Sequence, residues 1–155
     1  MLKRYLISSL AVALFALNAS AYDATKAENL DAFYSHMTQQ ACADSKLFTT
    51  GEDVMKMFRD KEKFTLLDVR TAGENAIVSL SSKNALHIPV EQLFEKANLD
   101  RLPTDQPLII ICHSGTRATI VAMGLQQIGF TKVHVLKGGL VALAEANDPK
   151  NAPVK

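Results

Sequence analysis

Uninterrupted apolar runs alternate with helical patterns along most of the chain. The most apolar run after the first 21 residues is PLIII at 107–111, and FTLLDV at 64–69 is similar. Runs of this length without alternating polar residues are typical of parallel strands that are buried on both faces. Shorter strand patterns occur at 84–87 and 132–136. Each of these segments predicts one strand of a common sheet.

The segments between the predicted strands show the periodicity of helices. Thr49 and Glu52 form a capping-box pattern, which predicts that a helix begins there. Further helices are expected after Pro89 and from Thr116, and Gly129 lies where a C-terminal cap would stand. The positions expected to face the core are Val54, Met57, Phe58, Val90, Leu93, Phe94, Ile120, Val121, Gly124, Leu125 and Ile128.

The order of these elements predicts the fold class. A last helix is expected for LVALAEA at 140–146, whereas the stretch 71–83 is expected to be irregular. Gly124 would let a neighbouring element approach its helix closely. Strands that alternate with helices pair in parallel through right-handed crossovers. With 155 residues the chain is large enough for one core, so we expect a single α/β domain.

Residues 1–21 differ in character from the rest. Lys3 and Arg4 precede the uncharged apolar run YLISSLAVALFAL, and Ala19 and Ala21 give the small-residue pattern of a signal-peptidase site. The run is shorter than the ~20 residues that a membrane-spanning helix needs, which disfavours an anchor. We interpret 1–21 as a cleavable signal peptide and expect a periplasmic or secreted protein without membrane attachment.

The next segment, 22–45, is interpreted as an N-terminal helical extension. Its residues 25–41 place apolar side chains on one helical face, namely Leu30, Phe33, Tyr34 and Met37. This helix is expected to pack on the domain or to dock a protein partner. The core domain is then expected to span 46–147, followed by a C-terminal tail at 148–155.

Charge excludes some classes of partner. Removal of Lys3 and Arg4 leaves 15 of the 17 Lys and Arg residues against 16 Asp and Glu, a net charge of −1 with neutral histidines. Nucleic acids and anionic membrane surfaces attract proteins with a basic excess. We therefore expect no nucleic acid, and a small molecule or another protein as partner.

Cys42 and Cys112 are the two cysteines of the chain. In an oxidising compartment, an even number of cysteines is explained most simply by a disulfide between them. The four histidines and two cysteines lack the spacing of metal ligands, so no metal site is predicted.

Cys112 also lies where a nucleophile would be expected. It follows the predicted strand 107–111, at the edge of the sheet where ligands bind in α/β domains. The polar turn HSGT contains Gly115, so its amides can form a cradle for an anion or a sulfur atom. The start of the next helix and Arg117 add positive charge. All three effects favour the thiolate form of Cys112, which is the nucleophilic form.

Spacing distinguishes two kinds of cysteine loop. Cys112 and Arg117 are spaced as Cys-x₄-Arg, one residue shorter than the Cys-x₅-Arg loop of cysteine phosphatases, and a smaller cradle suits sulfur better than a phosphoryl group. Four segments of the chain form a combination: LLDVR at 66–70 with Glu74, ALHIPVEQL at 85–93, IIICHSGTRA at 109–118 and GFTKVHVLKGGL at 129–140. Together, in this order, they resemble the single-domain rhodanese-like sulfurtransferases.

The resemblance implies a fold, a reaction and a set of site residues. It implies a parallel sheet of about five strands flanked by helices on both faces. Cys112 would take a sulfane sulfur from a donor such as thiosulfate and pass it, through a persulfide, to cyanide or a thiol, without a metal or organic cofactor. His113 would tune donor binding or be only a solvated residue. The donor-binding loop would comprise His113, Ser114, Gly115, Thr116 and Arg117.

Residues outside the loop have weaker assignments. Asp68 and Arg70 match the family's DVR pattern and would support the site. For Arg70 we expect an architectural ion pair with Glu74 rather than a catalytic role. His87 and His134 lie in strand patterns away from the loop, where structural roles are expected.

The chain departs from the family's pattern after Glu74. The family usually carries GHIPGA there, whereas this chain has NAIVSLSSKNA at 75–85, and its HIP at 87–89 matches a later family segment. The connection after the first strand is therefore altered, which leaves substrate access and specificity open.

Three hypotheses follow. The first is a periplasmic or secreted sulfurtransferase that uses Cys112. The second is a rhodanese-like persulfide carrier or thiol-redox partner of another protein, docked through the segment 22–45. The third is a structural domain in which a disulfide between Cys42 and Cys112 prevents turnover.

Overall fold

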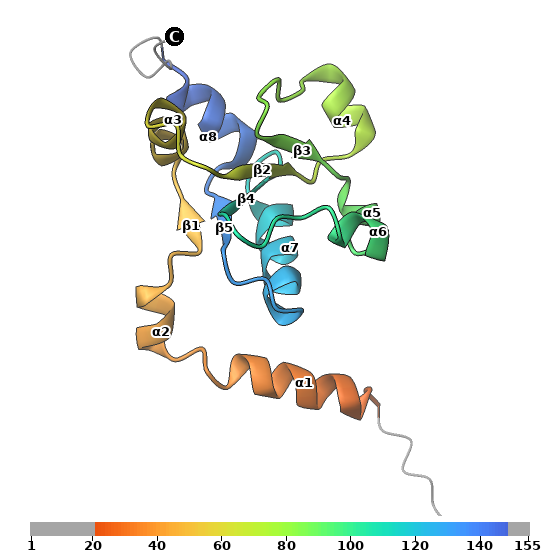
Figure 1. Ribbon diagram of the computed structural model, residues 1–155. Helices are drawn as coiled ribbons and strands as arrows, with labels where there is room; N and C mark the ends of the chain where they lie inside the picture. The colour runs from red at the N-terminus through yellow and green to blue at the C-terminus, as the bar shows by residue number, and fades with distance from the viewer. Residues whose placement is uncertain (1–20, 149–155) are drawn as a thin grey trace, which may run out of the picture. The chain divides into compact units, whose positions relative to one another are not determined.

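The computed structural model describes residues 21–148 (Figure 1). The predicted signal peptide, except for Ala21, and the tail after Asp148 lie outside the described residues. The described residues belong to two compact units, which are divided between Met37 and Thr38. The second unit contains the whole sheet and the segment around Cys112.

Two short helices occupy the predicted N-terminal extension. The first unit contains α1 (Ala24–Tyr34), and α2 (Gln39–Asp44) belongs to the second unit. Thr38 caps α2, because its hydroxyl accepts a hydrogen bond from a backbone amide in the first turn. The prediction of one continuous helix over 25–41 is therefore wrong, since the cap at Thr38 starts a new helix.

A parallel sheet with the strand order β1-β5-β4-β2-β3 forms the centre of the second unit. Its strands are β1 (Phe48–Thr49), β2 (Thr65–Asp68), β3 (Ala85–His87), β4 (Leu108–Ile111) and β5 (Val133–Leu136). The predicted α/β fold with a sheet of five parallel strands is thus confirmed. The apolar runs predict all strands but β1, which has only two residues and cannot show a periodicity.

Helices cover both faces of this sheet. In Figure 1, α3 (Gly51–Arg59) and α8 (Gly139–Ala146) lie on one side of the strands and α7 (Thr116–Gln127) on the other. All side chains of β4 are buried, and they alternate between the hydrophobic cluster with α7 and the cluster with α3 and α8. This two-sided packing fixes the end of β4, after which Cys112 follows.

The remaining helices are short. The helices after β3 are α5 (Val90–Leu93) and α6 (Lys96–Leu99). The stretch 71–83, predicted to be irregular, begins with another helix, α4 (Ala72–Ile77). A capping box between Thr71 and Glu74 starts α4, so the prediction is wrong for the first half of this stretch.

The start of α3 differs by one residue from the predicted start. Thr50 is the N-cap, and its hydroxyl accepts a hydrogen bond from the amide of Asp53 at 3.1 Å. The Asp53 carboxylate in turn accepts one from the Thr50 amide at 3.1 Å. Thr49 instead belongs to β1, where its carbonyl accepts a hydrogen bond from the amide of Lys137. The predicted N-cap is therefore already engaged in the sheet.

The buried face of α7 also differs from the predicted stripe. Its buried residues are Ala118, Val121, Ala122 and Leu125. Ile120 and Ile128, both expected in the core, are 67% and 53% exposed. The two alanines occupy the face in their place. Gly124 does admit a close neighbour, because a Cβ atom there would lie 2.7 Å from Cζ of Phe94.

Gly51 and Gly73 offer a matched test of the packing between α3 and α8. A Cβ atom at Gly51 would lie 2.5 Å from the backbone oxygen of Ala142 in α8, whereas one at Gly73 meets nothing closer than 4.0 Å. We expect Gly51→Ala to lower the free energy of unfolding by about 1–3 kcal/mol through overpacking. Gly73→Ala, in a helix, should raise it by about 0.4–1 kcal/mol.

Urea unfolding of both variants beside the wild type measures these changes. Equal stability of Gly51→Ala and Gly73→Ala would contradict the close packing of α3 on α8.

Candidate functional site

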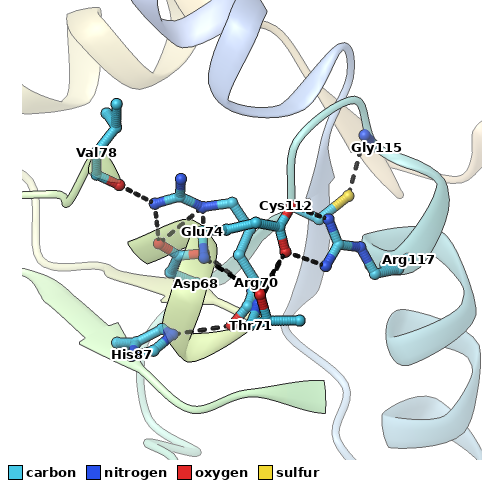
Figure 2. Close-up of polar contacts among 9 residues, drawn as sticks. All are labelled: Asp68, Arg70, Thr71, Glu74, Val78, His87, Cys112, Gly115 and Arg117. Atoms are coloured by element: carbon cyan, nitrogen blue, oxygen red, sulfur yellow. Dashed lines mark hydrogen bonds and ion pairs between the residues drawn. The ribbon is translucent and has the colours of Figure 1, made fainter. Parts of the chain in front are cut away.

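Cys112 lies directly after β4, at the carboxyl end of the sheet. The residue is only 1% exposed and belongs to the hydrophobic cluster on the α7 side. Its Sγ atom accepts a hydrogen bond from the amide of Gly115 at 3.1 Å, as Figure 2 shows. The backbone N–H of the loop is thus directed at the sulfur, where it can stabilise a negative charge.

Gly115 connects the loop to α7. Its φ of 106° is in the left-handed region, which a residue with a Cβ atom adopts only with strain. Its carbonyl accepts hydrogen bonds from the amide and the hydroxyl of Thr119, at 2.9 and 3.0 Å. The first turn of α7 is therefore fixed against the loop, with its positive end beside Cys112.

The loop residues predicted to bind a donor differ in exposure. His113, Ser114 and Thr116 are exposed, whereas Gly115 is buried and Arg117 is half-buried. The structure thus places the predicted loop residues around a buried sulfur with three side chains open to solvent.

A second turn, at the start of α8, packs against the loop. Leu140 donates from its amide to the carbonyl of Cys112 at 2.8 Å. Gly139 has a φ of 61°, and a Cβ atom there would lie 2.5 Å from the carbonyl oxygen of Cys112 and 2.6 Å from that of His113. Sequence reasoning assigns only a turn to KGG; the paired glycines between a strand and a helix are the signal that marks this close approach.

Arg117 forms a bidentate ion pair with Glu74 of α4. Its Nη1 and Nη2 atoms donate to the two carboxylate oxygens at 2.6 and 2.5 Å. The Glu74 carboxylate also accepts hydrogen bonds from the amide and the hydroxyl of Thr71, at 3.0 and 3.1 Å. Figure 2 shows this carboxylate between Thr71 and Arg117. Glu74 therefore joins α4 to the cysteine loop.

Both partners of this pair are ionised at neutral pH. The Arg117 guanidinium, followed by the Thr71 amide, holds the pKa of Glu74 well below its usual value. Glu74 in turn raises the pKa of Arg117 above its usual value. The charge of Arg117 is therefore balanced by a carboxylate of the same chain.

Asp68 and Arg70 form a separate ion pair that is buried. Arg70 donates from Nε and Nη2 to the Asp68 carboxylate at 2.9 and 2.6 Å. Asp68, through these hydrogen bonds, raises the pKa of Arg70 above its usual value. The predicted pair of Arg70 with Glu74 is therefore wrong. A spacing of four residues would suit a helix, but Arg70 lies before α4 and not within it.

Arg70 also holds the altered segment 75–85, which begins in the second half of α4. Its Nη2 atom donates to the carbonyl of Val78 at 2.8 Å. His87 in β3 donates from Nε2 to the carbonyl of Arg70 at 2.8 Å, and His134 makes a similar contact to Lys46 at 2.6 Å. Each of these two histidines therefore has a backbone partner, in keeping with a structural role.

The two cysteines are free thiols in the structure. Cys42 is exposed in α2, and Cys112 is buried. Among residues 21–148, no three His, Cys, Asp or Glu side chains lie together as a metal site would require. Within the same range, no helix is both long and apolar enough to cross a membrane.

The two larger hollows recorded for residues 21–148 lie outside the cysteine loop. One, of about 500 Å³, lies between the altered segment and α8, with Leu80, Ser81 and Leu140 among its lining residues. The other, of about 540 Å³, is lined by Thr65 and Lys63 at the amino end of β2, the end of the sheet opposite to Cys112. Leu140, which lines the first hollow, is also the residue whose amide contacts the carbonyl of Cys112.

Glu74 should contribute to stability in a pH-dependent way. Its pKa in the folded protein is depressed, so its contribution is present above the pKa of about 4.3 expected for the unfolded chain and is lost as pH falls further. We expect Glu74→Gln to be less stable than the wild type at neutral pH, by an amount that shrinks as pH falls below about 4. Because the carboxylate is partly exposed, solvent screening keeps this amount modest.

Urea unfolding of both proteins between neutral and acidic pH at low salt checks the expectation. A difference that stayed constant with pH would argue against an ionised Glu74 as its cause.

Comparisons with known proteins identify the family of the chain. The protein-family model of the rhodanese-like domain matches residues 50–146 of the sequence. A sulfurtransferase of Allochromatium vinosum is 30% identical over 103 residues, which cover 66% of this chain and 92% of the relative. Thiosulfate sulfurtransferase GlpE of Pseudoalteromonas translucida is 30% identical over 95 residues, which cover 59% of this chain and 83% of the relative.

A solved structure supports the fold. The rhodanese-like domain of an Anabaena protein superposes with a TM-score of 0.57 at 23% identity, covering 68% of this chain and 78% of that one. The family model spans more than half of the chain, from the start of α3 to the end of α8. The chain therefore belongs to the rhodanese-like domain family, and the relatives that it matches include sulfurtransferases.

Proposed function

We propose that the protein is a sulfurtransferase in which Cys112 carries the transferred sulfur as a persulfide. The observation that supports this most directly is the Gly115 amide, which donates to Sγ of Cys112 at the start of α7. Such a donor stabilises charge on a sulfur atom without forming a covalent bond to it. The cradle is built from backbone, so it is already in place when the donor arrives.

The reaction proceeds in two nucleophilic steps. The Cys112 thiolate attacks the outer sulfur of thiosulfate, an S–S bond forms to Cys112, and the S–S bond of thiosulfate breaks to release sulfite. An acceptor then attacks the outer sulfur of the persulfide and regenerates the thiolate. Cyanide leaves as thiocyanate, and an acceptor thiolate leaves as a new persulfide. Neither step requires a metal or an organic cofactor.

Burial of Cys112 constrains how a donor approaches. With the residue only 1% exposed, the terminal sulfur of the donor has to reach Sγ while the rest of the donor stays outside the loop. His113, Ser114 and Thr116 are exposed there and would contact that part of the donor. Asp68 and Arg70 support the site indirectly, through the ends of β2 and the altered segment.

The location of the protein belongs to the same proposal. Residues 1–21 have the features of a signal peptide, so we place the mature protein in the periplasm or outside the cell. The N-terminal sequence of protein isolated from that compartment should begin at Tyr22. A chain that still begins at Met1 would contradict this placement.

Replacement of the nucleophile gives the main test. Cys112→Ser should lose thiosulfate-to-cyanide transfer by at least ~10³-fold, because the serine hydroxyl cannot carry a sulfane sulfur. Cys42→Ser, which changes an exposed cysteine outside the loop, should retain wild-type activity and serves as the control. The intact mass of the wild type after thiosulfate should show one added sulfur atom that cyanide removes.

The outcomes separate the alternatives. Transfer by Cys112→Ser at the wild-type rate would contradict the assignment of Cys112. A persulfide that forms on Cys112 but turns over only with a protein acceptor would instead indicate a carrier.

A further inference from the structure

We infer that Glu74, by neutralising Arg117, determines which donor charge the site accepts. The geometry favours a sulfane-sulfur donor with a single negative charge over a dianion such as thiosulfate. The inference rests on the proposed sulfur transfer at Cys112 and names the class of donor for it. Glu74 is assigned a positioning and selectivity role, because it acts through Arg117 and not on the sulfur itself.

The charges around Cys112 cancel in pairs. Arg70 is matched by Asp68, and Arg117 is matched by Glu74. His113 and Lys137, on the loop and on the adjoining turn, are exposed, so water and salt screen any charge that they carry. When Cys112 is a thiolate, the two ion pairs and the sulfur together therefore carry one negative charge, which opposes the approach of a strongly anionic donor.

Glu74 also occupies the atoms that an anion would use. Both terminal nitrogens of Arg117 are bonded to its two carboxylate oxygens, at 2.6 and 2.5 Å. This fork is the geometry by which arginine binds oxyanions, including carboxylates and phosphates. A thiosulfate oxygen that approaches this terminal fork of the guanidinium has to compete with Glu74 for its N–H groups.

Glu74 is not free to swing away from Arg117. Its Oε2 atom is held at the same time by the amide and the hydroxyl of Thr71, at 3.0 and 3.1 Å. A donor that displaces Glu74 from Arg117 therefore acts against the capping box of α4 as well. This second anchor distinguishes the pair from an isolated surface salt bridge, whose partners separate readily.

A pair of donors isolates the effect of charge. Thiosulfate and the methanethiosulfonate anion both offer a terminal sulfur bonded to an oxidised sulfur, but they carry two negative charges and one, respectively. With either donor the Cys112 thiolate takes the terminal sulfur and the donor's S–S bond breaks. Sulfite leaves in the first case and methanesulfinate in the second, so the bond formed and the bond broken are the same.

Glu74→Gln removes the charge with little other change. Glutamine is accepted at this position of a capping box, so its side-chain oxygen can still accept a hydrogen bond from Thr71. We expect the variant to raise kcat/KM for thiosulfate about tenfold relative to methanethiosulfonate, mainly through KM, and the gain to diminish with added salt. In Glu74→Gln/Arg117→Gln the charges cancel again, so the ratio of the two donors should return to the wild-type value.

Thr50→Ala is the structural control. It weakens the capping box of α3 but leaves Thr71, Glu74 and Arg117 in place, so it should lower stability without changing the donor ratio. A binding measurement complements turnover: in the unreactive Cys112→Ser background, the amide signal of Gly115 can be followed by NMR during titration with each donor. In this background, Glu74→Gln should tighten the binding of thiosulfate more than the binding of methanethiosulfonate.

A donor ratio that Glu74→Gln leaves unchanged would overturn the inference, as would equal losses with both donors. Failure of the proposed function is distinguishable, because it would show as transfer that does not depend on Cys112. Even if transfer does not depend on Cys112, the dissociation constants of the two donors in the Cys112→Ser background still test the effect of Glu74 on donor binding.

Discussion

The close contact between two backbone turns determines the geometry of the site. The turn before α8 and the loop after β4 approach so closely that a Cβ atom at Gly139 would overlap the carbonyl of Cys112. At this contact the amide of Leu140 donates a hydrogen bond to the carbonyl oxygen of Cys112 at 2.8 Å. The sulfur of the same residue accepts a hydrogen bond from the amide of Gly115 at 3.1 Å. Backbone groups of two turns therefore hold Cys112, one at its carbonyl and one at its sulfur.

Carboxylates pair with both arginines that could otherwise bind an anion near Cys112. Asp68 holds Arg70 in the interior, and Glu74 holds Arg117 at the edge of the loop. The backbone amide and the end of α7 are therefore the positive features that remain directed at the sulfur. A site of this kind recognises a sulfur atom by close fit, and it attracts the donor's remaining charge only weakly.

The parts of the structure that have strong local signals could be predicted from the sequence. The apolar run of β4 and the small polar loop after it show both the central strand and the position of Cys112. β1 is too short to produce a pattern. The pairing of Glu74 could not be read from its spacing to Arg70, because its partner lies 43 residues further along the chain. The capping box at Thr71 was nevertheless visible in the sequence TAGE, and it would have predicted α4.

The altered segment 75–85 is joined to the site although it contains no residue of the cysteine loop. Glu74 precedes it and contacts Arg117, and the carbonyl of Val78 within it accepts a hydrogen bond from Arg70. Its residues Ser79–Ser82 then line the hollow that reaches Leu140 beside the loop. A change in its length or packing would therefore shift the carboxylate that neutralises Arg117. On the role that we propose for Glu74, donor selectivity depends on this connection as well as on the loop.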